Sequence, residues 1–214
     1  MVTLKWFGQA CFEISNGKTV VTDPHDGDSV GLSAPDTKGD IVTVSHDHYD
    51  HASGKDLVSG SDTVVVEGMH GGGAEGIGLK RIESYHDKAE GDARGDNTIF
   101  KFEVGGFSIC HLGDLGHVLE PAKIDELGSV DILLIPTGGK FTIDGDEASE
   151  LVEKIDPRVV VPMHYKIEGL DVPISGPGQF VRSIKGKYEV VEEEFLELEE
   201  LPAKKTVYVL GCQA

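Results

Sequence analysis

The sequence has few cysteines, no long apolar run and little positive charge. Its three cysteines, Cys11, Cys110 and Cys212, are isolated and odd in number, so they make no CxxC pair and no disulfide framework. No stretch approaches the roughly 18 apolar residues of a membrane span, and the first residues lack the basic and apolar parts of a signal peptide. We therefore expect buried free thiols, no membrane span and a cytoplasmic protein.

The charge balance is strongly acidic. The chain has 19 lysines and arginines against 38 aspartates and glutamates, so its formal net charge is −19. Such a chain repels phosphate backbones at long range, which disfavours nucleic acid as a partner. Its 214 residues suffice for one sizeable core and are short for two, so residues 1–214 are expected to form a single domain. The composition is compatible with a monomer or a homo-oligomer.

Short β-like runs broken by glycine and aspartate dominate the chain. Asn16-Gly17 between two apolar runs is typical of a tight hairpin. Strands are expected at residues 3–7, 11–15, 19–23, 41–45, 63–67, 80–85, 98–104, 107–112, 131–135, 159–162 and 206–210. Helices are expected at residues 121–127, 146–155 and 179–184, with Asp146 capping the second. The glutamate-rich stretch 189–200 is interpreted as the solvated face of one amphipathic element.

Four side chains that can bind a metal lie within six residues, directly after the apolar run 41–44: His46, His48, Asp50 and His51. On a helix, residues two apart point about 200° apart, so His46 and His48 could not share an ion. If the segment instead extends a strand, the side chains of His46, His48 and Asp50 would point to the same side of the chain. A turn after Asp50 would then bring the His51 side chain toward them. Mixed imidazole and carboxylate ligands suit zinc, iron or manganese. The spacing therefore predicts a metal site where a strand opens into a loop.

One segment cannot complete the shells of two ions, so further ligands must be distant in sequence. The candidates stand at or just beyond the ends of apolar, strand-like runs, where layered sheet proteins collect functional side chains: His86, His111, Asp114 and His164. Singly, each has an ordinary structural explanation, since Asp114 follows a glycine as a turn residue does. Only their combination with the first segment makes them candidate ligands.

The segment Ser45-His46-Asp47-His48-Tyr49-Asp50-His51 resembles the HxHxDH signature of the metallo-β-lactamase superfamily. Other motifs are similar to the branch of L-ascorbate-6-phosphate lactonase and N-acylphosphatidylethanolamine phospholipase D: Trp6-Phe7-Gly8-Gln9-Ala10-Cys11-Phe12, Pro136-Thr137-Gly138-Gly139 and Pro162-Met163-His164-Tyr165. The resemblance covers nearly the whole chain. It implies an α/β (α+β) fold, a four-layer αββα sandwich with its site at one edge of the two sheets.

The resemblance also implies a site for two divalent ions, with zinc favoured and manganese or iron as alternatives. The first ion would be bound by His46, His48 and a third histidine, the second by Asp50, His51 and His164, with Asp114 between them. The third histidine is expected to be His86, with His111 as the alternative. Residues expected to support the ligands or face the substrate are Asp23, Asp87, His111 and His117. Of these, Asp87 is expected to orient a neighbouring imidazole.

The activity implied is hydrolysis of a small lactone, phosphoester or related ester-like substrate by a hydroxide that two ions activate. Asp50 or Asp114 would steer the proton of this nucleophile, and no GxSxG elbow for a serine nucleophile is present. The alternative is an iron-dependent oxidoreductase of the persulfide dioxygenase kind on the same fold. Diiron flavoprotein reductases of the superfamily carry glutamate where this chain has His48, and a metal-binding protein without turnover would be expected to lose a ligand. We therefore expect a hydrolase.

Overall fold

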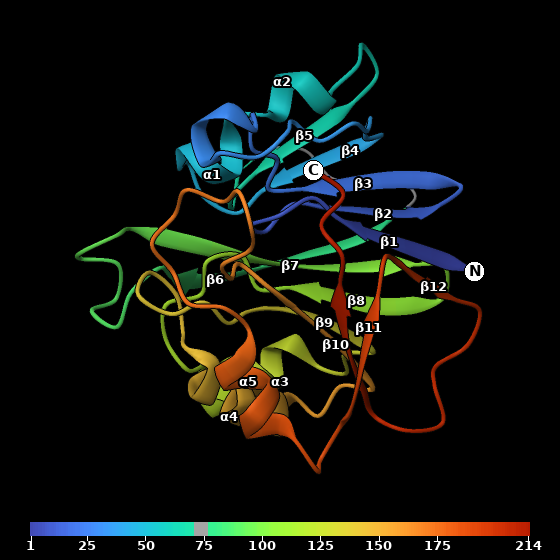
Figure 1. Cartoon of the computed structure of the whole chain (residues 1–214). Coiled ribbons are helices and arrows are strands. Elements are labelled where there is room, and N and C mark those ends of the chain that lie inside the picture. Colours follow the sequence, from blue (N-terminus) through green and yellow to red (C-terminus); the bar gives the residue numbers. More distant parts are fainter. Residues whose placement is uncertain (71–76) are drawn as a thin grey trace.

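Two mixed β-sheets, packed face to face, form the body of the protein (Figure 1). The structure is a computed structural model and describes residues 1–70 and 77–214. In these residues the first sheet has the strand order β12-β1-β2-β3-β4-β5, and the second has the order β11-β13-β10-β9-β8-β7-β6. The first sheet contains β1 (Val2–Trp6), β2 (Phe12–Asn16), β3 (Lys18–Thr22), β4 (Ile41–Val44), β5 (Val64–Glu67) and β12 (Leu196–Leu198). The second contains β6 (Gly78–Tyr85), β7 (Asp96–Val104), β8 (Phe107–His111), β9 (Ile132–Pro136), β10 (Val159–Met163), β11 (Glu189–Glu193) and β13 (Thr206–Leu210).

Helices cover the two outer faces unequally. The second sheet is covered by α3 (Pro121–Leu127), α4 (Gly145–Ile155) and α5 (Gly178–Ile184). The first sheet carries the short helices α1 (Tyr49–Ala52) and α2 (Lys55–Val58), with the 3-10 turn η1 (Asp28–Val30) nearby. The layers follow the expected αββα order, with one helical layer much thinner than the other. In the part of the chain that the structure describes, no helix is long and apolar enough to cross a membrane.

The main core lies between the sheets, and a second core lies under the helices. In β9, Ile132 and Leu134 join the cluster shared with the first sheet, whereas Leu133 and Ile135 join the cluster shared with α4 and α5. Both faces of the second sheet are therefore buried, which explains why its central strands appear in the sequence as continuous apolar runs. All three cysteines are free thiols, and Cys212 differs from the expectation in being partly exposed.

The predicted cap of the second helix is wrong, because α4 begins one residue earlier. The Asp144 side chain accepts hydrogen bonds from the backbone N–H groups of Asp146 and Glu147, both at 3.0 Å, and the Glu147 carboxylate accepts one from the Asp144 backbone. This reciprocal pair is a capping box. Asp146 instead accepts hydrogen bonds from Gln179 and Ser183, so it joins α4 to α5.

Replacing Asp144 with alanine is expected to lower the free energy of unfolding by about 1 kcal/mol, within the roughly 0.5–2 kcal/mol range of cap deletions. The reason is that two backbone donors at the start of α4 lose their acceptor. Urea denaturation checks this, with Glu150→Ala in the exposed middle of the same helix as control. Equal destabilisation by the two substitutions would contradict the assignment of the cap.

The expectation of one amphipathic element at residues 189–200 is also wrong. The stretch forms two strands in different sheets: β11 pairs with β13 in the second sheet, and β12 pairs with β1 in the first. In β12 the buried Leu196 and Leu198 alternate with the exposed Glu197. Both strands lie at sheet edges, where charged side chains discourage pairing with other chains.

Candidate metal centre

The candidate residues meet at one edge of the sandwich because the strands that precede them end there. In the second sheet β6, β8 and β10 run in the same direction, and their carboxyl ends lead into His86, Asp114 and His164. In the first sheet β3 and β4 are parallel, and their carboxyl ends lead into Asp23 and His46. Residues far apart in sequence thereby come together at the place where parallel strands end.

The first group of candidate ligands consists of His46, His48 and His86. One ring nitrogen from each lies within 4.8 Å of the others, an arrangement that could hold a metal ion. His46 Nε2 is 2.9 Å from His48 Nδ1, and the His86 ring centroid lies 4.8 Å from that of His46. His48 and His46 are partly exposed, whereas His86 is buried. The first group therefore opens toward solvent on one side.

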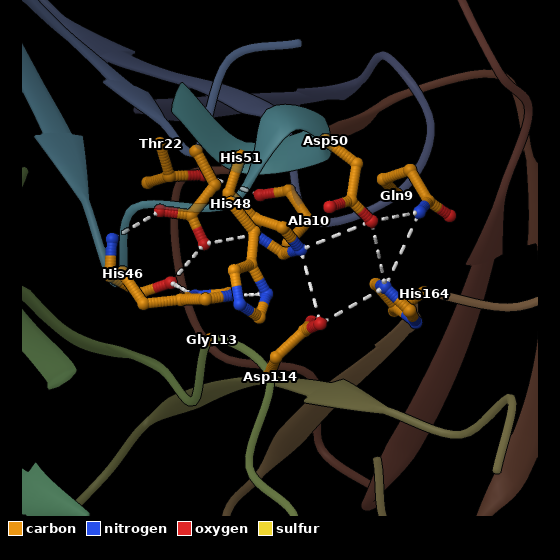
Figure 2. A network of polar contacts seen from close by, with 12 residues as sticks. Gln9, Ala10, Thr22, His46, His48, Asp50, His51, Gly113, Asp114 and His164 are labelled. Carbon is orange, nitrogen blue, oxygen red and sulfur yellow. Dashed lines mark hydrogen bonds and ion pairs between the residues drawn. The ribbon is translucent and has the colours of Figure 1, made fainter. Parts of the chain in front are cut away.

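The second group consists of four buried residues, Asp50, His51, Asp114 and His164. Asp114 Oδ2 is 3.1 Å from His51 Nε2 and 3.3 Å from His164 Nε2 (Figure 2). The same oxygen is 3.3 Å from His86 Nε2, which belongs to the first group. One carboxylate oxygen therefore contacts both groups.

The local backbone explains how one short segment supplies both groups. The strand β4 ends at Val44, and after His48 the chain forms the single helical turn α1. This turn carries Asp50 and His51 into the second group. The expectation that Asp50 shares one side with His46 and His48 is therefore wrong, because helix geometry replaces strand alternation after His48.

Asp23 orients His51 through a set of buried hydrogen bonds. Its carboxylate accepts from the Ser45 backbone N–H at 2.7 Å and from the Ser45 hydroxyl at 2.6 Å, and it lies 2.9 Å from His51 Nδ1. With Nδ1–H donating to Asp23, the other nitrogen, Nε2, faces Asp114. A carboxylate behind a metal-binding histidine commonly fixes the ring and its tautomer in this way.

Burial and close charges move the pKa values of the site in different directions. For His51, burial lowers the pKa, but Asp114 and Asp50 outweigh it and hold the pKa well above its ordinary value. For Asp114, burial raises the pKa, but His164 and His51 outweigh it and hold the pKa well below the usual range. Burial lowers the pKa of His46 to about 3, so this ring is neutral at pH 7. The buried carboxylates of Asp50 and Asp114 thus favour a positive charge near them, which either a protonated His51 or a bound cation would supply.

The site also contains buried polar atoms that need a partner. Among the described residues, no hydrogen bond reaches His86 Nδ1, Asp114 Oδ1 or His164 Nδ1. Buried polar atoms almost always have a partner, so this clustering indicates a bound group that the chain itself does not supply. Imidazole and carboxylate donors around a buried excess of negative charge fit divalent transition-metal ions.

Gln9 is a residue of the site for which the sequence predicted no role, although it belongs to the motif at residues 6–12. It is buried, and its side-chain amide donates to Asp50 Oδ2 at 2.9 Å and lies 3.3 Å from His164 Nε2. Its backbone has a φ of 46°, and Asp23 and His164 also have positive φ. Such strained backbone often occurs at functional sites. The one available signal was the position of Gln9 directly after a glycine, between two short strands.

Two of the predicted supporting histidines lie outside both groups. His111 donates from Nε2 to the Ala10 carbonyl at 2.9 Å and accepts at Nδ1 from the Gly113 backbone at 3.2 Å, so both of its ring nitrogens are occupied. His117 accepts at Nε2 from the Tyr85 backbone N–H at 3.4 Å. Neither ring shares the second group with Asp114.

The expectation that Asp87 orients a neighbouring imidazole is wrong. Its carboxylate accepts hydrogen bonds at 2.7–3.0 Å from four backbone N–H groups of the following loop, those of Ala89, Gly91, Ala93 and Arg94. Asp87 therefore organises the connection between β6 and β7.

Comparisons with known proteins agree with this geometry. The profile of the β-lactamase superfamily domain matches residues 3–164. A UPF0173 metal-dependent hydrolase from Methanosarcina mazei is 32% identical over 215 residues, which is 87% of this chain and 92% of the relative. The structure of a metallo-β-lactamase superfamily protein from Thermotoga maritima aligns with a TM-score of 0.78 at 37% identity, covering 98% of each chain.

More distant structures show the same fold. A protein from Parabacteroides distasonis aligns with a TM-score of 0.71 at 15% identity, covering 99% of this chain and 94% of that one. The fold expected from the resemblance is thus confirmed, with two mixed sheets and few helices. The chain belongs to the metallo-β-lactamase superfamily, and within it to the UPF0173 metal-dependent hydrolases.

Proposed function

We propose that the chain hydrolyses a small lactone, phosphoester or related ester-like substrate with two divalent ions, zinc being favoured over manganese or iron. The observation that carries the proposal is the position of Asp114 Oδ2, 3.1–3.3 Å from Nε2 of three histidines in two groups. A carboxylate that contacts both groups suits a ligand shared between two ions. The Thermotoga maritima relative, described as a candidate zinc-dependent hydrolase, supports the choice of metal.

In this proposal each group would hold one ion. The first would be held by His46, His48 and His86 and the second by Asp50, His51 and His164, with Asp114 available to both. Two such ions would supply a water molecule whose pKa is lowered toward about 7 and a polarised scissile bond. Asp23 keeps the proton of His51 on Nδ1, and the Gln9 amide holds the Asp50 carboxylate in place.

Asp50 is the better placed of the two aspartates to accept the proton of the nucleophile. Both aspartates line the pocket above the site, but the Asp50 side chain is 11% exposed, against 3% for that of Asp114. Asp114 lies deeper, between the two groups, where it orders the site. The Asp50 carboxylate therefore takes up the proton, while Asp114 keeps its position.

Two hollows adjoin the site, and both suit a small molecule. The pocket above the site has a volume of about 220 Å³, and a second hollow, lined in part by His46, His48 and Arg94, has a volume of about 520 Å³, within the roughly 300–1,000 Å³ of small-molecule pockets. A net charge of −19 repels long nucleic acids. Both features support a small-molecule substrate.

The function is tested by metal analysis together with a screen of lactone, phosphodiester, thioester and β-lactam substrates, with zinc, manganese and iron each supplied. We expect two ions per chain and turnover of a lactone or phosphoester. Stoichiometric iron with thiol-dependent oxygen uptake, and no hydrolysis, would instead establish the oxidoreductase.

The two candidates for the third histidine of the first group, His86 and His111, are expected to respond differently to replacement by alanine. His86→Ala is expected to lose one equivalent of metal. His111→Ala is expected to keep both and to lower the free energy of unfolding by about 1–3 kcal/mol, because the buried Gly113 N–H loses its acceptor and the Ala10 carbonyl keeps only the Thr22 hydroxyl as a donor. Metal content and urea denaturation of both variants measure this. Loss of metal in His111→Ala alone would reverse the assignment.

A further inference from the structure

Arg94 places a positive charge at the pocket above the candidate metal centre. It lines this pocket together with His48, Asp50, His86 and Asp114. Among the described residues that line the pocket, Arg94 is the one lysine or arginine. Arg94 is exposed, so its guanidinium is accessible to a solute that enters the pocket.

The loop that carries Arg94 is held firmly to the site. The Asp87 carboxylate accepts the Arg94 backbone N–H at 2.7 Å, and the His86 backbone N–H donates to the Gly95 carbonyl at 3.1 Å. On its outer side the loop is joined to α4 by the ion pair between Lys88 and Glu147. The backbone of Arg94 is therefore fixed relative to the candidate ligand His86, at the other end of the same loop.

The charge of Arg94 is not neutralised by the residues around it. Within residues 1–70 and 77–214 the structure shows no ion pair for its guanidinium, which instead lies 4.6 Å from the ring centroid of Phe141. Lys140 Nζ lies 5.3 Å from the same centroid, so the Phe141 ring contacts two cations. A cation–π contact orients a guanidinium while leaving its N–H groups available to an anion.

From this arrangement we infer that the substrate of the proposed hydrolase is a small anion, and that Arg94 binds its carboxylate or phosphoryl group next to the scissile bond. The inference rests on the proposed function, because it names the substrate class of that site. The planar guanidinium presents two parallel N–H donors that match the oxygens of a carboxylate or phosphoryl group. Arg94 is thus a specificity-determining residue, distinct from the ligands and from the aspartate that takes up the proton.

The first test is equilibrium binding of two anionic probes, benzoate and phenylphosphonate, to the zinc-loaded protein by calorimetry. Arg94→Ala is expected to weaken binding of at least one probe by about 10- to 100-fold, since hydrogen bonds to charged groups are the stronger ones. Arg94→Lys keeps the charge without the paired donors and is expected to lose part of this affinity. The preferred probe distinguishes a carboxylate from a phosphoryl group.

Arg182→Ala, which removes the same charge from the exposed surface of α5, is the matched control and is expected to bind as the wild type does. Equal affinity of the wild type and Arg94→Ala for both probes would overturn the inference. So would the absence of measurable binding by the wild type.

The second test compares two esters with the same leaving group, neutral p-nitrophenyl acetate and anionic mono-p-nitrophenyl succinate. Arg94→Ala is expected to raise KM about tenfold or more for the anionic ester and to change KM for the neutral one much less, whereas the Arg182→Ala control is expected to hydrolyse both esters as the wild type does. An equal effect on both esters would overturn the inference. Arg94-dependent binding of a probe, without hydrolysis of any substrate in the wider screen, would instead overturn the proposed function and leave the anion site standing.

Discussion

Replacing Asp114 with alanine is expected to lower the rate of hydrolysis by at least about a hundredfold, since loss of a mere supporting partner of a metal ligand already costs roughly 10–100-fold. The physical reason is that Asp114 Oδ2 contacts histidines of both groups, so its removal affects both ions at once. Metal content is expected to fall below two ions per chain. Steady-state kinetics and elemental analysis of the purified variant measure the two effects.

Asp47→Ala is the matched control for Asp114→Ala. Asp47 lies in the same histidine-rich segment, but it is exposed and belongs to neither group of candidate ligands. It is expected to keep both ions and most of the activity. An Asp114→Ala variant that keeps two ions and full activity would show that this carboxylate is not shared between metals.

Removing metal is expected to lower the melting temperature by about 8–16 °C, because an ion present at a thousandfold excess over its Kd stabilises the fold by about 4 kcal/mol and a domain of this size shifts by roughly 2–4 °C per kcal/mol. Without a cation, the buried carboxylates of Asp50 and Asp114 have only the neighbouring histidines, chiefly His51 and His164, to balance their charge. Thermal denaturation with and without a chelator measures the change.

The chelator experiment has an internal control in Asp114→Ala, whose response is expected to be much smaller because it binds less metal. Restoring zinc to the wild type is expected to restore its melting temperature. A shift below about 2 °C after elemental analysis has shown complete removal would indicate that the centre contributes little to stability.

The sequence predicted the parts of the site that depend on short spacing or on strand ends. His46 to His51 lie in one segment, and His86, Asp114 and His164 follow runs whose strands proved to be parallel. Their roles as ligands stay predictions, whereas their proximity is now a feature of the structure. The histidine spacing also pointed correctly to the end of a strand.

Other parts depend on contacts that no local pattern contains. The Gln9 amide reaches Asp50 only because a tight turn carries it across the site. The position of Arg94 depends on the Asp87 carboxylate, which was expected to orient an imidazole. In each case a side chain bonds to the backbone or to a distant residue. Such a contact cannot be predicted from the spacing of residues along the chain.

In the fold, too, the elements with a clear local pattern were predicted and those without one were missed. Strands with alternating or continuous apolar residues were predicted to within a few residues, because burial on one or two faces leaves a clear pattern. The pair β11 and β12 was missed, since their glutamates at the two sheet edges resemble a solvated surface. The turn α1 was missed as well, because four residues are too few to show a helical period.

The pairing of β1 with β12 sets the order in which the protein can mature during its synthesis. Val2 pairs with Leu198, and the carbonyl of Trp6 accepts the backbone N–H of Gln213. At roughly 5–20 residues per second, a ribosome needs about 10–40 s to supply these partners. Trp6 in turn holds the Gln9 turn through its indole N–H. The nascent chain therefore completes the surroundings of its candidate metal centre only after residue 213 has been synthesised, when both sheets have emerged.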